Sequence, residues 1–198
     1  MFRPGFHWRS QTEAHTGIAQ CGPCKFTIPA HTLTLQQVFR GGFLALVREA
    51  ATADACGILA CLSAAFEVYR GSYTPAAFAD TILTPETLQR RLQEMTVFVT
   101  TEKSGEIVGT IACSVVSTEE GHIRGMAILP TVQGSGIAAE LLKHAEAHFR
   151  KRNCKRISLD TTAPLTRAIR FYERAGFSRS EKVQDFFGMP LYEYVKAI

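Results

Sequence analysis

Long apolar runs are missing from this sequence. The longest uncharged apolar stretches, residues 55–66 and 107–116, fall well short of the ~20 residues that a membrane helix requires. No apolar segment follows the early arginines, so the pattern of a secretory signal is missing as well. We therefore expect neither an integral membrane protein nor a secreted one.

Cysteine is sparse. With 6 cysteines among 198 residues, the sequence cannot build a disulfide scaffold. Four of them lie inside apolar periodic segments, where cysteine behaves as a small hydrophobic residue: Cys56, Cys61, Cys113 and Cys154. A chain of this length forms one domain that buries roughly 70% of its unfolded surface without disulfides. These features favour a reducing, cytoplasmic compartment.

A strong excess of one charge is also missing from most of the chain. Of the formal net charge of +4, residues 1–42 account for +3, because four cations there face Glu13 alone, and the remaining residues have only +1. A nucleic-acid-binding domain needs a basic face on its folded body. We therefore expect no nucleic-acid partner.

Residues 1–42 show neither helical nor strand periodicity, and we interpret them as a poorly ordered N-terminal extension. Cys21 and Cys24 have the spacing of a thioredoxin motif, but no strand precedes them and no amphipathic helix follows. A zinc site that includes His15 or His31 would lack a second ligand pair at regular spacing. We therefore assign neither a redox centre nor a metal site to this segment.

From residue 43 to residue 198 the pattern predicts one α/β domain on a mixed sheet. Thr74 and Thr84 each precede a proline, which is typical of a helix start, and Asp54 is a candidate cap for the first helix. The predicted strands are 43–50, 97–101, 107–116, 122–129, 156–160 and two within 183–195. The predicted helices are 54–69, 75–95 with a break near Thr84, 137–149 and 164–176.

A glycine-rich turn follows the strand at 122–129. It reads Gln133-Gly134-Ser135-Gly136-Ile137-Ala138 and opens a helix. Small residues let a ligand approach the backbone, and the N–H groups of a first helical turn have no intrahelical partner, so the turn suits a phosphate or pyrophosphate. Ala139 replaces the third glycine of a dinucleotide fingerprint, and no Gly-Lys-Ser/Thr is present. The turn therefore matches neither a dinucleotide fingerprint nor a P-loop.

Two segments resemble signatures of the GNAT superfamily of N-acetyltransferases. Gln133-x-x-Gly136-x-Ala138 matches its Gln/Arg-x-x-Gly-x-Gly/Ala motif and directly follows a strand. Residues 168–177 look like its Ala-x-x-x-Tyr-x-x-x-Gly-Phe helix, with Tyr172 as the tyrosine. The two signatures occur in the family's order and at about its spacing. One departure is Leu165, where the family often has an asparagine that touches the pantetheine arm.

The resemblance implies a GNAT-type mixed, mostly antiparallel central sheet flanked by helices. It also implies acetyl transfer from acetyl-CoA, as cosubstrate and without a metal, to a primary amine of a small molecule or protein by direct attack in a ternary complex. The family's cofactor contacts map here to the backbone of Ala127 and Ile128 for the pantetheine arm. The pyrophosphate contacts map to Gln133, Gly134, Ser135, Gly136, Ile137 and Ala138.

The resemblance further places Tyr172 next to the cofactor, as the acid that protonates the departing thiolate. A phenol pKa of about 10 lies near the thiol value of about 8.5, so this proton transfer is not steeply uphill. His122 occupies the position of the family's usual carboxylate base, with Glu119 and Glu120 as alternatives that act through water. Strand alternation predicts that His122, Arg124 and Met126 share one face. Arg124 would then lower the imidazole pKa or hold an anionic substrate.

Three functional hypotheses stay open. The first is the acetyltransferase, whose acceptor would lie near Tyr69, Arg70 and Tyr73. The second is a catalytically degenerate acyl-CoA binding or sensor module, which the presence of Tyr172 disfavours. The third is a modifier of charged RNA, which the nearly neutral body disfavours. We expect a small-molecule or peptide amine as partner, no nucleic acid and no membrane, and we allow for a homodimer.

Overall fold

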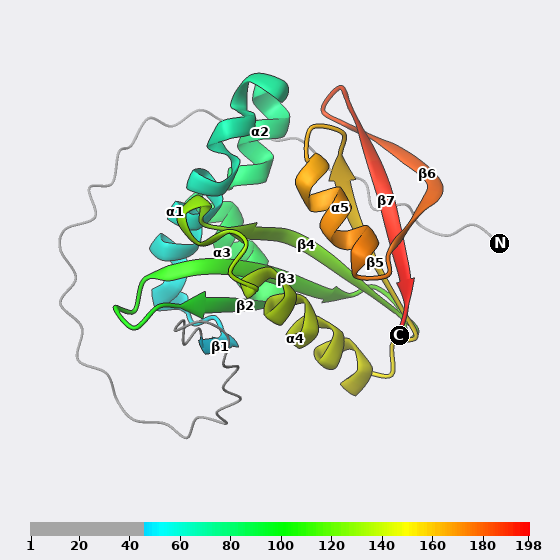
Figure 1. Cartoon of the computed structure of the whole chain (residues 1–198), viewed down its shortest axis with the longest axis horizontal. Coiled ribbons are helices and arrows are strands. Elements are labelled where there is room, and N and C mark those ends of the chain that lie inside the picture. The colour runs from blue at the N-terminus through cyan, green and yellow to red at the C-terminus, as the bar shows by residue number, and fades with distance from the viewer. Residues whose placement is uncertain (1–45) are drawn as a thin grey trace. The chain divides into compact units, whose positions relative to one another are not determined.

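A seven-stranded mixed sheet organises residues 46–198, the part of the chain that this computed structural model describes (Figure 1). The strand order is β1-β2-β3-β4-β5-β7-β6, and all neighbouring strands in this part are antiparallel except β4 and β5. The strands are β1 (Leu46–Glu49), β2 (Thr96–Thr101), β3 (Ile107–Val115), β4 (Glu120–Ile128), β5 (Arg156–Thr162), β6 (Ser178–Phe186) and β7 (Met189–Ala197). The predicted extension at 1–42, with its cysteine pair and histidines, lies outside the described residues.

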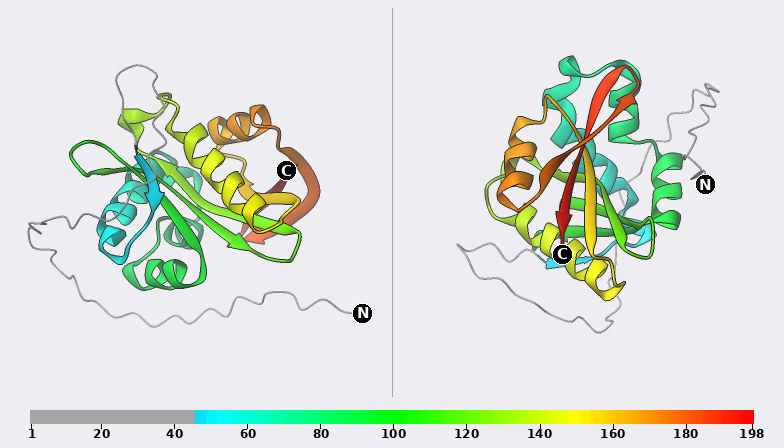
Figure 2. Two further views of the ribbon diagram at one scale, coloured as in Figure 1. Left: turned by 90° about the horizontal axis from the view of Figure 1, so that it is seen from below. Right: turned by 90° about the vertical axis from the view of Figure 1, so that its right-hand side faces the viewer.

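Helices cover both faces of the sheet (Figure 2). One face carries α1 (Ala55–Phe66), α2 (Pro75–Ile82) and α3 (Pro85–Glu94), and the other carries α4 (Ile137–Lys151) and α5 (Thr166–Arg174). Short 3-10 turns precede and follow α1, at Thr52–Asp54 and Glu67–Ser72, and a third, Pro130–Val132, precedes the glycine-rich turn. The mixed sheet with flanking helices confirms the predicted fold class.

Two of the three predicted helix caps are present in the structure. The hydroxyl of Thr74 accepts the N–H of Ala77 at 3.2 Å, and the Thr84 hydroxyl accepts the N–H of Thr87 at 3.3 Å, as their positions before proline predicted. The prediction for Asp54 was wrong. Its carboxylate accepts the N–H of Ala51 at 2.7 Å and pairs with Arg48 at 2.6 Å, so it serves the 3-10 turn before α1.

Several boundaries differ from the predictions because strand pairing extends the strands. Glu120 belongs to β4, where it pairs with Arg156, and not to the preceding turn. The final hairpin begins at Ser178, well before the predicted start at residue 183, because Ser178 pairs with Val195. The last helix begins at Thr166, two residues after Pro164, and Gly176 takes the left-handed conformation expected after it, with φ of 91°.

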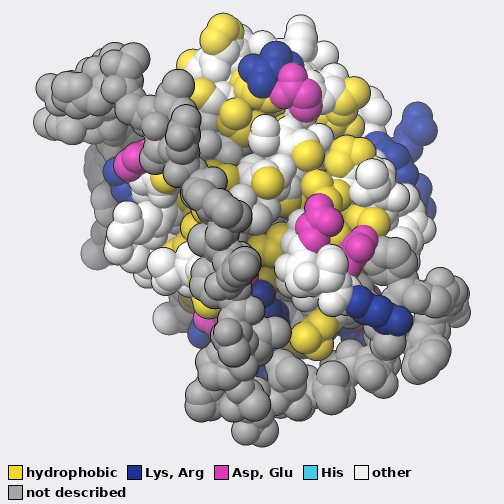
Figure 3. All heavy atoms as spheres, turned by 90° about the vertical axis from the view of Figure 1, so that its left-hand side faces the viewer, with side chains coloured by type: hydrophobic (Ala, Val, Ile, Leu, Met, Phe, Trp, Pro, Cys, Tyr) yellow, Lys and Arg dark blue, Asp and Glu magenta, His cyan; other side chains and the backbone are white. Residues whose placement is uncertain are grey.

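Two apolar clusters pack on the two faces of the sheet. On the side of α4 and α5, Phe149, Leu141 and Ile111 are fully buried, and on the side of α1 to α3 so are Ile58 and Leu88. The helical run Thr52–Ser72 is long and apolar enough to cross a membrane by length and composition. The most apolar window of this run is 28% buried, and α1 within it packs in the second cluster. Apolar side chains also reach the surface on the side seen in Figure 3, among charged ones.

Gly121 of β4 is packed directly against the ring of Phe149. A methyl group on this glycine would overlap the ring, which is completely buried. We therefore expect Gly121→Ala to destabilise the fold by about 1 to 3 kcal/mol through overpacking and to lower Tm by several degrees. Thermal unfolding measures this, with Gly71→Ala as control, because nothing lies within 4 Å of the corresponding methyl position. Equal Tm values for the two variants would contradict the prediction.

Candidate active site

The strands β4 and β5 pair briefly and then separate. Their parallel pairing runs from Glu120 opposite Arg156 to Ile123 opposite Leu159. β4 then continues to Ile128 without a strand on that side among the described residues, and the two ribbons diverge in Figure 1. The edge of β4 that faces away from β3 is therefore open over its second half.

A bulge in β4 lies at the start of this open segment. Ala112 of β3 faces Arg124 and Thr110 faces Ala127, so that Gly125 and Met126 together face one residue of β3. Gly125 has φ of 62°, a left-handed conformation that favours glycine. In a regular strand, every second side chain points to the same face of the sheet. The extra residue in the bulge shifts this alternation by one, so side chains after the bulge point to the opposite face from the one that the regular pattern predicts.

This exchange overturns the prediction that three side chains of β4 share one face. Arg124 reaches Asp80 of α2, at 2.9 Å, on the side of α1 to α3. Met126 instead packs in the cluster beneath α4 and α5, where its Sδ lies 3.6 Å from the hydroxyl of Tyr172. Strand alternation alone cannot reveal a bulge, so the sequence placed Met126 on the wrong face.

The backbone of Ile128 faces the opening. Leu129 donates its N–H to Val108 of β3 at 2.8 Å, and Ile128 lies opposite Gly109. Because backbone groups of successive residues point to opposite edges of a strand, the N–H and C=O of Ile128 point away from β3. Those of Ala127 point toward β3, so of the two residues predicted to contact the pantetheine arm only Ile128 presents its N–H to the opening.

The glycine-rich turn lies beyond the end of β4 and presents backbone N–H groups. Gly134 and Gly136 have φ of 89° and 96°, and Gly136 is the residue before the first turn of α4. Ser135 uses its N–H internally, toward the carbonyl of Val132 at 3.3 Å. Within the described part of the chain, no group accepts the N–H of Gly134, Gly136, Ile137 or Ala138. Such N–H groups at a helix N-terminus suit a phosphate group.

Two side chains brace this turn. The amide nitrogen of Gln133 donates to the carbonyl of Ile128 at 3.1 Å, and its oxygen accepts from the guanidinium of Arg167 at 2.8 Å. Arg167 lies at the start of α5, near Gly134. The guanidinium adds a positive charge beside the unpartnered N–H groups, so the chain offers a cradle for a pyrophosphate. The sequence reading missed Arg167, although it lies one residue before the second signature.

Tyr172 lies on α5, on the face of the sheet to which Met126 of the bulge points. Its side chain is 8% exposed and packs against Phe171 and Phe177. Burial raises the pKa of Tyr172 above its ordinary value, because a buried phenolate would lose its hydration. The phenol therefore keeps its proton at neutral pH, and its pKa lies further above that of a thiol than the ordinary phenol value does.

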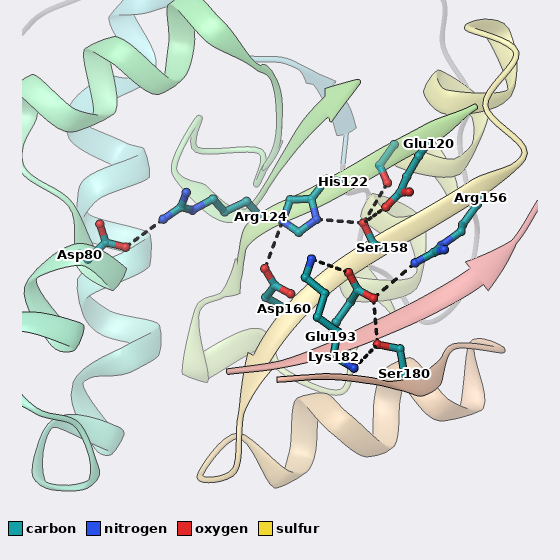
Figure 4. A network of polar contacts seen from close by, with 11 residues as sticks. Asp80, Glu120, His122, Arg124, Arg156, Ser158, Asp160, Ser180, Lys182 and Glu193 are labelled. Carbon is teal, nitrogen blue, oxygen red and sulfur yellow. Dashed lines mark hydrogen bonds and ion pairs between the residues drawn. The ribbon is translucent and has the colours of Figure 1, made fainter. Parts of the chain in front are cut away.

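On the opposite face of β4, His122 lies within a network of polar side chains (Figure 4). Its Nδ1 lies 3.1 Å from the hydroxyl of Ser158, which donates to Oε1 of Glu120 at 2.8 Å. Its Nε2 lies 3.7 Å from Oδ2 of Asp160. The structure thus brings two predicted candidates, His122 and Glu120, into one network with two residues of β5 that the sequence reading missed.

The charges around His122 come from three strands. Burial lowers the pKa of His122, and the cations of Arg124 on β4 and Lys182 on β6 lower it further. Asp160 on β5 and Glu120 on β4 oppose this shift. Burial also raises the pKa of Asp160. At neutral pH the ring is therefore mainly uncharged and able to accept a proton.

The remaining base candidate, Glu119, lies apart from this network. Its carboxylate is exposed and pairs with Lys155 at the surface at 2.8 Å.

The predicted acceptor residues lie on the connection between α1 and α2. Tyr73 shares a hydrogen bond of 2.6 Å with Thr162 at the end of β5, whereas Arg70 pairs with Glu67. Of these residues, Tyr73 is tied to the strand that lines the opening.

A small cavity of about 230 Å³ lies under α1, away from the polar network. Its lining includes Cys61, Gly57, Leu129 and Asp54. Burial raises the pKa of the Cys61 thiol to about 12, so this cysteine is no nucleophile at neutral pH. Asp54 is paired with Arg48. Neither Cys61 nor Asp54 is therefore activated for catalysis.

A family model and several known proteins match this chain. The model of the Acetyltransferase (GNAT) family matches residues 60–177, which is more than half of the chain. The chain is 37% identical over 79 residues to the uncharacterized N-acetyltransferase YjgM of Escherichia coli (strain K12), which covers 38% of this chain and 47% of that protein. It is 28% identical over 86 residues to N-alpha-acetyltransferase MAK3 of Arabidopsis thaliana, which covers 42% and 45%. The chain thus spans about half the length of the curated relatives it matches.

Solved structures share the fold. The PaiA N-acetyltransferase from Thermoplasma acidophilum, determined in complex with coenzyme A, has a TM-score of 0.65 and 16% identity, and the match covers 78% of this chain and 99% of that chain. Ard1 from Thermoplasma volcanium has a TM-score of 0.64 and 19% identity over 78% of this chain and 97% of that chain. Identities this low show the fold alone.

Proposed function

Because the chain belongs to the acetyltransferase (GNAT) family, we propose that it is an acetyl-CoA-dependent N-acetyltransferase that uses direct attack in a ternary complex. The acceptor is a primary amine of a small molecule or a protein. The observation that supports this most is the open edge of β4. The N–H of Ile128 faces that edge, the glycine-rich turn lies beyond its end, and Tyr172 and His122 lie on its two faces.

In this proposal, the glycine-rich turn and Arg167 bind the pyrophosphate of acetyl-CoA, which supplies an acetyl group activated as a thioester. The N–H of Ile128 donates to the carbonyl oxygen as negative charge develops there. A preorganised donor of this kind contributes on the order of 3 kcal/mol to lowering the barrier. Gln133 holds the carbonyl of Ile128, which lies on the same edge of β4 as this N–H.

Proton transfer is divided between the two faces of β4. An aliphatic amine with a pKa of about 10.4 is almost wholly protonated at neutral pH, so a base must take its proton. His122 takes this proton, and Tyr172 gives its own to the departing thiolate. The buried, neutral phenol and the uncharged imidazole both have the protonation state that these roles need.

The acceptor is proposed by similarity. MAK3 is named an N-alpha-acetyltransferase, and another relative is named a mycothiol acetyltransferase. We therefore propose a protein or peptide N-terminus, or a small amine, as acceptor and the cytoplasm as the compartment. The second functional candidate, an acyl-CoA sensor without catalysis, is disfavoured by the intact network around His122 and by Tyr172.

Thiol release from acetyl-CoA, measured across amines, amino acids and peptide N-termini, tests the proposal. We expect turnover with at least one acceptor class. We also expect His122→Gln to lower kcat by about 10²- to 10⁴-fold, the usual contribution of a general base. Tight acetyl-CoA binding without turnover on any acceptor would favour the sensor hypothesis. No binding at all would refute acetyl-CoA as the cosubstrate.

The pH dependence of kcat/KM follows from the lowered pKa of His122. Protonation removes its lone pair, so activity is lost as the pH falls through a value below the ordinary pKa of about 6.5. We expect a plateau that persists below pH 6.5 with an acceptor amine that titrates far above this range. His144→Gln, which changes a histidine of α4 outside the network, should keep this profile. A native acidic limb above pH 6.5 would contradict the prediction.

A further inference from the structure

The hydroxyl of Ser158 has three polar neighbours, and the farthest of them is the carbonyl of Gly121 at 3.5 Å. Ser158 is 2% exposed, and its hydroxyl donates to Oε1 of Glu120 at 2.8 Å. A serine hydroxyl has one hydrogen to donate. The second contact, at 3.1 Å to Nδ1 of His122, therefore requires that Nδ1 donates its hydrogen to the serine oxygen.

This arrangement fixes the tautomer of the neutral ring. With the hydrogen on Nδ1, the lone pair of the imidazole is on Nε2. Nε2 points toward Asp160, whose Oδ2 lies 3.7 Å away, as Figure 4 shows. The other carboxylate oxygen of Asp160, Oδ1, is buried and accepts no hydrogen bond from the residues that the structure describes.

A lone pair and a carboxylate that face each other lack a hydrogen-bond donor between them. An ammonium group has three donor hydrogens and a positive charge, and it complements both Nε2 and Asp160. The cations nearest to this pair, Arg124 and Lys182, are held by other carboxylates, Asp80 at 2.9 Å and Glu193 at 3.0 Å.

We propose that Ser158 and Glu120 are positioning residues that hold His122 as the Nδ1–H tautomer, and that Nε2 and Asp160 together bind the acceptor ammonium group. This inference rests on the proposed function, in which His122 is the base. One ammonium proton passes to Nε2, and the freed nitrogen lone pair forms the bond to the thioester carbonyl carbon. The C–S bond breaks, and the thiolate takes its proton from Tyr172. The acylated nitrogen loses a second proton, which restores the Tyr172 phenol through solvent, so the products are the amide, the free thiol and His122 with one added proton.

The first test removes the hydroxyl that fixes the tautomer. In Ser158→Ala we expect kcat to fall about 10- to 100-fold, as for other partners that orient a functional histidine, with the KM for acetyl-CoA unchanged. In Glu120→Gln the amide oxygen still accepts from Ser158, so the loss should be smaller. Ser180→Ala is the matched control, because Ser180 also donates to a glutamate, Glu193 at 2.8 Å, without contacting His122.

The second test observes the ring directly by two-dimensional ¹H–¹⁵N NMR of the histidine side chains, which distinguishes the tautomers without any turnover. The native protein at neutral pH should have the His122 proton on Nδ1. Ser158→Ala should give a mixture of tautomers, and Ser180→Ala should keep the native signal. A native proton on Nε2, or an unchanged ring signal and pH profile in Ser158→Ala, would overturn the positioning role.

The third test concerns Asp160. Asp160→Asn removes the negative charge and should raise the KM for the acceptor amine at least 10-fold, with a much smaller effect on the KM for acetyl-CoA. An unchanged KM for the acceptor amine would refute the proposal that Asp160 binds its ammonium group. These outcomes are separable from failure of the proposed function. If His122→Gln kept full activity, the base assignment would fall, and the NMR result would still decide the tautomer.

Discussion

Replacing Tyr172 with phenylalanine should lower kcat about 10²- to 10⁴-fold, the usual contribution of a general acid, and leave the affinity for acetyl-CoA nearly unchanged. The phenol is buried, and its hydroxyl contacts only the weak acceptor Sδ of Met126 at 3.6 Å among the described residues. Phenylalanine keeps the ring that packs against Phe177. The loss should therefore fall on proton delivery to the thiolate and not on folding.

Steady-state kinetics and calorimetric titration with acetyl-CoA separate these effects. Tyr194→Phe is a matched control, because Tyr194 is 5% exposed and belongs to the same apolar cluster. It should keep native kcat. If Tyr172→Phe retained native kcat, the acid role would be excluded. If it mainly lost stability, Tyr172 would be a packing residue.

A glutamate in place of Gly136 should weaken acetyl-CoA binding more than 100-fold, which corresponds to about 2.7 kcal/mol. Two effects act together. Gly136 has φ of 96°, a conformation that strains any other residue. The new carboxylate would also lie among N–H groups that suit a phosphate anion, and it would repel that anion. Calorimetric titration of the purified variant with acetyl-CoA measures the loss.

Gly105→Glu provides the control for Gly136→Glu. Gly105 lies in the turn between β2 and β3, has φ of 86° and, like Gly136, has nothing within 4 Å of its added side-chain carbon. The variant therefore has comparable backbone strain and the same charge at a different place, and its affinity for acetyl-CoA should stay native. Unchanged affinity in Gly136→Glu would show that the pyrophosphate binds elsewhere.

Local sequence signals predicted the elements that local physics determines. The helix after Gly136, the threonine caps and the Gly176 stop depend on neighbouring residues, so they could be read directly. The family signatures added Tyr172 as a candidate. The periodic patterns predicted an α/β domain on a mixed sheet, and the resemblance to the family added the mostly antiparallel arrangement.

The polar network could not be predicted because it depends on the register between β4 and β5. Ser158 and Asp160 meet His122 across a parallel pair whose residues are 36 or more positions apart in the sequence. The available signal was the alternation of polar residues with Ile157 and Leu159 in β5. The face of Met126 could not be predicted either, since the bulge at Gly125 depends on pairing with β3.

The short pairing between β4 and β5 also has a mechanical meaning. It joins two leaves of the sheet, one made of β1 to β4 and the other of β5, β7 and β6, along four pairs of residues. The apolar cluster that contains Ile111 and Leu159 clamps the two leaves together on one face. On the other face, the contact between His122 and Ser158 crosses the seam. Any change in the angle between the leaves therefore acts directly on the orientation of the imidazole ring.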